Sequence, residues 1–351
     1  MKFFDIFSRT PKNTESVVLI DIGTSSVAGA YVHYAEGELP TFLYTESEPI
    51  KAHKGEPEEG AMLRALKTLG ETLIREGAPI LARTTGSGTA QKIIVSIDAP
   101  WQETTVHTEH FEENEPFIFT ENMVSKRLKE THKELEEKKM LVDESIIGTI
   151  LNGYGTQEPY GKKANHASVI VLTSLIESGI ATNIVSTLEH LFHRTSVLPI
   201  AGNSLRYQAM REVFPHERDA LILDATNEEL SSISLVRRGL IVSLIQAKVR
   251  SGADAWATTI TNELAELSNQ FPLPRTIFLL ARESDINSLQ KALDTVNFGA
   301  LWLSDNPPKI VPVLKTHMST SVRQSTEQPV DVVLLLMALF YAHAKERKEK
   351  F

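Results

Sequence analysis

The pattern of apolar and polar positions repeats one short motif along the chain. The apolar run 17–20 ends in Asp21, and a glycine and three hydroxyl residues then lead into a second apolar run. The apolar run 221–223 likewise ends in Asp224, and apolar residues return at 230–236 after a polar turn. Short apolar runs rich in branched side chains predict buried strands. The repeat of strand, aspartate, turn and strand therefore indicates an internal duplication.

Other segments follow the periods of regular secondary structure. Apolar residues three and four apart predict helices at 58–76, 120–139, 178–192, 256–271 and 285–293, and a buried helix at 332–342. Runs rich in β-branched residues predict strands at 29–34, 41–44, 92–97, 145–151, 167–173, 240–245 and 276–281. Alternation at 104–119 predicts an exposed strand pair, and 83–90 reads as a polar loop. This order predicts an α/β protein, with a compact unit of its own at about 98–192.

Composition narrows the class of protein. A chain of 351 residues holds roughly two domains, or one large lobed unit. The net charge of −9 argues against nucleic-acid binding, which needs a basic face. The absence of cysteine excludes disulfides, thiolate metal sites and cysteine nucleophiles, and fits a reducing cytoplasm. The longest apolar run, 332–342, is too short for the roughly 20 residues of a membrane span.

The first repeated motif carries candidate phosphate chemistry. Gly23 permits unusual backbone angles, and Thr24, Ser25 and Ser26 offer hydroxyl and N–H groups to an anion. With Asp21 these residues form a candidate cradle for phosphate and Mg²⁺. An ordinary β-turn remains the alternative.

The second motif supplies a counterpart with Asp224, Thr226 and Asn227. Two such hairpins facing each other could clamp phosphates from both sides.

Other candidate sites are weaker. His190 and His193 share one helical face, but no third metal ligand accompanies them. His107 and His110 fall on opposite faces of a predicted strand and do not converge. No Ser-His-Asp arrangement follows from the spacing. We therefore predict neither a metal site nor catalytic residues of these kinds.

The N-terminus combines aromatic residues with cations. The apolar residues are Phe3, Phe4, Ile6 and Phe7, with lysine and arginine on both sides. A short amphipathic segment of this kind could make weak contact with a membrane surface. A frayed terminus, or a segment docked on the body, is the alternative.

Two stretches carry a resemblance to a known family. The segment from Asp21 to Val27 reads Asp-Ile-Gly-Thr-Ser-Ser-Val, and 145–164 contains Asn152-Gly153 followed by a Glu-Pro-Tyr-Gly turn at 158–161. The first resembles the phosphate motif of the actin-like ATPase superfamily. The second is similar to a strand and turn of the bacterial FtsA/PilM family, which belongs to that superfamily. The resemblance in order and spacing covers about 16–344.

The resemblance implies a duplicated, ribonuclease-H-like, two-lobed actin-like fold with an inserted SHS2 domain and a reduced IIB subdomain. The implied parts are an N-terminal amphipathic segment and linker at 1–14, lobe I at 15–97, 193–218 and 326–351, the SHS2 insertion at 98–192, and lobe II at 219–325 with its reduced IIB at about 246–272.

The chain departs from the family at the nucleotide contacts. The second phosphate turn, 224–229, contains no glycine and ends in two glutamates, which would repel phosphate. The segment 278–284 lacks the paired glycines of the family's adenosine motif. One hypothesis is a working ATPase with Asp21 on Mg²⁺ and Thr24 to Ser26 on the phosphates of ATP. The departures favour the other, a pseudo-ATPase that keeps the body as an adaptor or polymer subunit.

The resemblance also implies a function and a location. We predict a cytoplasmic scaffold, peripheral on the inner face of the cell membrane, that binds proteins and not nucleic acid. One form of this prediction is the cell-division role of FtsA proteins, which tether the septal ring to the membrane and recruit division proteins to it. The alternatives are a PilM-like adaptor in type IV pilus assembly, bound to a pilus inner-membrane protein, and an active, self-associating ATPase. The length and the N-terminus resemble PilM, whereas the SHS2 region resembles FtsA.

Overall fold

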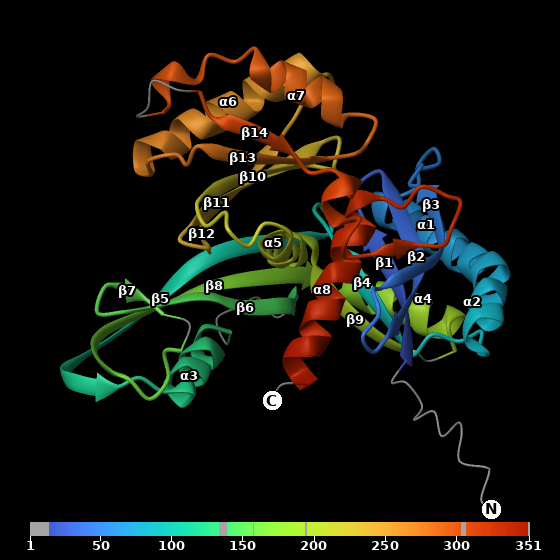
Figure 1. The fold of residues 1–351 in the computed structure, drawn as a ribbon, viewed down its shortest axis with the longest axis horizontal. Helices are drawn as coiled ribbons and strands as arrows, with labels where there is room; N and C mark the ends of the chain where they lie inside the picture. The colour runs from blue at the N-terminus through green and yellow to red at the C-terminus, as the bar shows by residue number, and fades with distance from the viewer. Residues whose placement is uncertain (1–13, 133–138, 157, 194, 303–306, 350–351) are drawn as a thin grey trace, which may run out of the picture.

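The structure, a computed structural model, describes residues 14–132, 139–156, 158–193, 195–302 and 307–349. Its strands form three sheets, which Figure 1 shows with helices packed between and around them. Within the described ranges, no helix is both long and apolar enough to cross a membrane. The N-terminal segment with the predicted membrane contacts lies outside the described residues.

The first sheet has six strands in the order β15-β3-β2-β1-β4-β9. The strands are β1 Thr14–Ile22, β2 Ser26–Ala35, β3 Thr41–Pro49, β4 Lys92–Ile97, β9 Ser196–Ala201 and β15 Arg323–Gln324. β1, β2 and β3 form an antiparallel meander, and β4 and β9 continue the sheet parallel to β1. The carboxyl ends of β1, β4 and β9 therefore lie at one edge.

The second sheet repeats this arrangement with five strands in the order β12-β11-β10-β13-β14. The strands are β10 Ala220–Ala225, β11 Leu230–Arg237, β12 Leu240–Lys248, β13 Thr276–Ala281 and β14 Lys309–Pro312. β10, β11 and β12 form the antiparallel meander, and β13 and β14 run parallel to β10. The predicted duplication is confirmed, because the two sheets share strand order and direction.

Helices cover the outer faces of the two sheets. On the first sheet they are α1 Glu58–Thr72, a π-helical turn Leu73–Gly77, α2 Ala78–Thr85 and α4 Ser178–Leu191. On the second sheet they are α6 Ala253–Gln270 and α7 Ile286–Asp294, followed by the short 3₁₀ turn Phe298–Ala300.

Two helices fill the space between the sheets. They are α5 Gly202–Val213 and α8 Val332–Glu349, and the 3₁₀ turn Lys315–Met318 lies between β14 and β15 in the chain. One apolar cluster joins both helices to the inner faces of both sheets (Figure 1). The first eight residues of α8 are buried on every side, which explains an apolar run without a polar face.

The third sheet is formed by the part of the chain that lies between β4 and β9 in the sequence. It is a separate layer of the fold. Its strands are β5 Gln102–Ile118, β6 Lys139–Leu151, β7 Tyr154–Gly155 and β8 Lys163–Glu177, in the antiparallel order β5-β8-β6-β7. The helix α3 Glu121–His132 covers one face through its own apolar cluster, which contains Phe119, Val124 and Leu128.

Two local predictions were wrong. Residues 104–118 of the predicted strand pair 104–119 all belong to one strand of 17 residues, β5. It continues without a turn because β8 pairs with it along most of its length. The predicted polar loop at 83–90 begins inside α2, whose polar residues face solvent while Leu81 is buried. The predicted helix at 120–139 is found as α3 as far as His132, 133–138 lie outside the described residues, and Lys139 already belongs to β6.

Candidate functional site: the cleft between the two lobes

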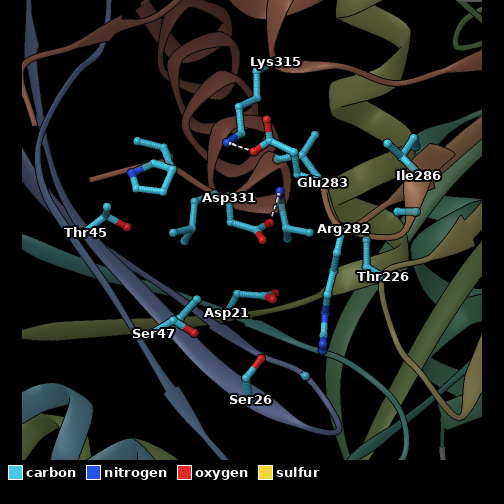
Figure 2. A pocket seen from close by; sticks show the side chains of 18 of the residues that line it. Asp21, Ser26, Thr45, Ser47, Thr226, Arg282, Glu283, Ile286, Lys315 and Asp331 are labelled. Atoms are coloured by element: carbon cyan, nitrogen blue, oxygen red, sulfur yellow. Dashed lines mark hydrogen bonds and ion pairs between the residues drawn. The ribbon is translucent and has the colours of Figure 1, made fainter. Parts of the chain in front are cut away.

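The turns after β1 and β10 face each other across the cleft between the two sheets. A cavity of about 600 Å³ opens beside them, and Figure 2 shows the side chains that surround it. Six of the eight residues predicted to bind phosphate line this cavity: Asp21, Gly23, Thr24, Ser26, Thr226 and Asn227. The other two, Ser25 and Asp224, lie next to it in the same turns.

In the first turn, backbone and side-chain hydrogen bonds hold the predicted residues. The Gly23 N–H donates to the carbonyl oxygen of Ser26 over 3.0 Å. A Cβ on Gly23 would lie 3.3 Å from that same oxygen, so the closeness of the turn favours glycine. The Thr24 hydroxyl donates to the carbonyl oxygen of Ala99 over 2.9 Å. The Ser25 carbonyl accepts the N–H of Ile50 over 2.8 Å.

In the second turn, the polar side chains bond to one another. Asp224 Oδ1 accepts hydrogen bonds from the N–H and the hydroxyl of Thr226, over 3.1 and 2.6 Å. Asn227 Oδ1 accepts the N–H groups of Glu229 and Leu230, over 2.9 and 3.1 Å. These bonds order the turn without glycine.

Side chains also join the two turns directly. Asn227 Nδ2 donates to the Thr24 hydroxyl and, over 3.2 Å, to the carbonyl oxygen of Ala99. Arg282, which follows β13, donates to Ser25 Oγ and to Glu228 Oε1, both over 2.5 Å. The two lobes therefore touch at the place where the sequence predicted a phosphate clamp.

A buried arginine lies between aspartates of the two lobes. Arg206 on α5 donates to both carboxylate oxygens of Asp98, over 2.9 and 2.6 Å. Its Nε forms an ion pair with Asp224. All three side chains are buried. Burial of an ion pair is favourable only when the partners are well matched, and the two-point geometry satisfies that condition.

The same cluster perturbs the ionisation of Asp21. Burial, reinforced by the charge of Asp98, raises the pKa of Asp21 to about 8. The nearby cation Arg206 opposes this shift only in part. Burial also raises the pKa of Asp98, against the influence of Arg206. For Arg206 burial acts to lower the pKa, but Asp224 and Asp98 outweigh it and raise the pKa overall. The folded protein therefore favours the protonated form of Asp21.

Three residues of the site, Asp98, Arg206 and Arg282, were not predicted from the sequence. A signal for Asp98 was present, since it directly follows a β-branched strand and strand carboxyl ends meet at one edge. No comparable local signal marks Arg206, which lies 108 residues from Asp98. The histidines add nothing to the site. In the described part of the chain, no three metal-binding side chains are grouped as a metal site would require.

Comparison with solved structures supports the fold, whereas comparison of sequences found no match. The sequence matches no family model and no curated protein sequence. The duplicated sheets, the two helices between them and the interlobe cleft define an actin-like ATPase fold.

One chain of a solved PilM–PilN type IV pilus biogenesis complex has this fold, with a TM-score of 0.57 and 14% identity over 93% of this chain and 98% of that chain. The predicted two-lobed actin-like α/β fold is therefore confirmed, whereas the SHS2 insertion and the reduced IIB subdomain stay predictions.

Two further solved structures align over most of the chain with lower scores. One is a Bacteroides thetaiotaomicron protein with an actin-like ATPase fold, with a TM-score of 0.45 and 9% identity over 96% of this chain and 99% of that chain. The other is the cytoplasmic domain of EpsL, an inner-membrane component of the Vibrio cholerae type II secretion system. Its TM-score is 0.40, with 7% identity over 93% of this chain and 95% of that chain.

Proposed function

We propose that the protein is an actin-like adaptor of the PilM type, peripheral to the inner membrane, which binds the cytoplasmic segment of an inner-membrane assembly protein. The observation that carries this proposal is the match to the PilM–PilN structure along nearly the whole of both chains. A match of that extent includes the third sheet as well as the two lobes. The domain division and the SHS2 assignment made from the sequence are part of the same proposal.

A docking surface for such a partner lies where the first and third sheets meet. β9 forms the edge of the first sheet, and β6 lies against it. Leu198 on β9 is 41% exposed and Ile146 on β6 is 42% exposed. Exposed apolar side chains on these two strands offer contact area to a bound segment. An extended partner segment with apolar residues fits this surface.

We further propose that the cleft does not bind MgATP. The two turns touch through Asn227 and Arg282, so a phosphate chain between them would have to break these contacts. Arg206 already neutralises the buried aspartates that a Mg²⁺ ion would otherwise need to approach. Glu229 in the second turn adds like charge, and Glu228 is held by Arg282. Titration with MgATP in a calorimeter tests this proposal, and binding at micromolar concentration would contradict it.

The experiment on the partner compares two baits. The purified protein is incubated with the cytoplasmic tail peptide of a PilN-type pilus protein and, separately, with a tubulin-like division-ring protein. We expect the tail peptide to bind. Binding of the division-ring protein alone would contradict the PilM-type role and favour the division role, which stays a prediction.

We also propose that Phe3, Phe4, Ile6 and Phe7 contact the membrane surface. Deletion of residues 1–12 should then release the protein from liposomes in a sedimentation assay. Unchanged sedimentation of the truncated chain would refute the contact.

A further inference from the structure

The contacts that join the two lobes leave the cavity beside them open. Its volume of about 600 Å³ lies within the range of about 300–1,000 Å³ that small-molecule sites occupy. Strands β1 to β3 form one wall, and the start of α8 with the segments after β13 and β14 forms the other. The cavity is therefore large enough for a ligand independently of the phosphate turns.

Two carboxyl groups point into the same part of this space. Figure 2 shows Asp21 and Asp331 facing each other there, with Thr45 and Ser47 at one side. Asp21 Oδ1 is buried without a hydrogen-bond partner among the described residues. A buried acceptor of this kind is costly unless a donor reaches it. The Ser96 hydroxyl favours the charged form of Asp21, but less than burial opposes it. A ligand in the cavity would supply a further donor to Oδ1.

Asp331 lies at the N-terminus of α8. Asp331 precedes α8, and its Oδ1 accepts the N–H of Val333 over 2.8 Å, as an N-cap residue does. The partial positive charge of a helix N-terminus stabilises an ionised carboxylate. The same bond satisfies the helix, so its N-terminus is not left open for an anion.

The cations around the cavity already have partners. Lys315 forms an ion pair with Glu283, and Arg282 bonds to Ser25 and Glu228 (Figure 2). Arg206 is engaged by Asp98 and Asp224 behind the cavity. Asp21 and Asp331 thus lack a cation of the cavity wall dedicated to them.

The opposite part of the wall is apolar. Leu314 lines the cavity and is 40% exposed, which is unusual for so large an apolar side chain. Val313, Val330 and Ile286 are buried beside it in the same wall. A ligand that fits would carry hydrogen-bond donors at one end and a hydrocarbon portion at the other.

We propose that this cavity binds a small alkylammonium ion, such as an aliphatic diamine, with the ammonium group between Asp21 and Asp331. An ammonium group has three donors and no acceptor, which suits two carboxyl groups and a neighbouring hydroxyl. The alkyl chain lies along the exposed side chain of Leu314. The site is independent of the proposed adaptor role. Its carboxyl groups suit a cation, whereas the phosphates of a nucleotide require positive charge.

The test uses calorimetry on the full chain with putrescine at pH 8.5, above the pKa of Asp21. We expect a dissociation constant of about 1 mM or lower, as ordinary small-ligand affinities allow. Asp331→Asn and Asp21→Asn should each weaken binding by about tenfold or more, through loss of a charge-assisted contact. Both variants should fold, because asparagine is also a good N-cap and is nearly isosteric with a protonated aspartate.

Glu46→Gln is the matched control. It removes the same charge at the rim of the cavity, but the Glu46 carboxylate is held by the Tyr44 hydroxyl over 3.1 Å and by the Ser47 N–H over 3.1 Å. We expect a change in affinity of less than about twofold.

No binding at millimolar putrescine, or equal binding by all variants, would overturn the proposal, as would equal binding of the neutral 1,4-butanediol. MgATP is titrated in parallel. Its binding would contradict the nucleotide proposal alone.

Discussion

Arg206 and Asp98 form a two-point ion pair, with both guanidinium Nη atoms on the two oxygens of one buried carboxylate, at 2.9 and 2.6 Å. Asp98 belongs to the first lobe, and through Nε the same guanidinium reaches Asp224 of the second. The cluster thus joins the two halves of the duplicated fold with a cation that the chain itself supplies. Removing the Arg206 cation would change the electrostatics of the entire cleft.

We predict that Arg206→Ala lowers the free energy of unfolding by about 3–5 kcal/mol, because Asp98 and Asp224 would remain buried without a counter-charge. Urea denaturation of the purified protein measures the loss. Arg64→Ala is the control, since Arg64 pairs with Glu56 over 2.7 Å in a solvent-exposed position, and its loss should cost far less stability than that of Arg206. Equal losses for the two variants would argue against the buried cluster.

The raised pKa of Asp21 predicts a dependence of stability on pH. Its carboxyl group titrates near 3.8 when unperturbed and near 8 in the folded protein. Between these values the folded state holds more protons, so this group makes stability fall as pH rises from about 4 to about 8.

Asp21→Asn should therefore be more stable than the parent at pH 7, with an advantage that shrinks toward pH 4. Urea denaturation at pH 4, 5, 6, 7 and 8 tests this, and taking the difference between the two proteins removes the contributions common to both. An advantage that grew as pH fell would show the opposite sign and refute the assignment.

The bond between the two turns predicts a cost for Asn227→Ala. The substitution removes the contacts to Thr24 and Ala99 across the cleft as well as the bonds to Glu229 and Leu230 within the turn. We expect a loss of about 1–3 kcal/mol and faster amide hydrogen exchange in both turns.

Asn297→Ala provides the comparison for Asn227→Ala. Asn297 Oδ1 accepts only a local N–H, that of Gly299, over 3.1 Å. Its loss should leave exchange in the turn after β1 unchanged. Faster exchange there in both variants would show that the effect does not come from the cleft.

The proposed docking surface predicts that Leu198→Glu strongly weakens binding of a PilN-type tail peptide without unfolding the protein. A charge at the centre of an apolar contact costs roughly 2 kcal/mol or more, or at least about thirtyfold in affinity. Fluorescence anisotropy of a labelled peptide measures it. Leu39→Glu introduces the same charge at a residue of similar exposure, 39%, beyond the end of β2, and should bind like the parent.

Much of the fold could be predicted because its signals are local. The buried strands β1 and β10 each carry the predicted aspartate one residue before the strand ends, and the turns after them do face one cleft. Prediction failed at β5, where the partner strand β8 decides whether alternation continues. It failed again at α2, where the burial of Leu81 outweighs a polar composition.

The sequence by itself determined the duplication, the strand ends with Asp21 and Asp224, and the missing glycines of the second turn. Only the tertiary structure decided what those aspartates meet. The decisive contacts join residues 108, 203 and 257 positions apart: Arg206 with Asp98, Asn227 with Thr24, and Arg282 with Ser25. Charge neutralisation depends on distances of a few ångströms and on burial, which packing sets and local periodicity does not encode.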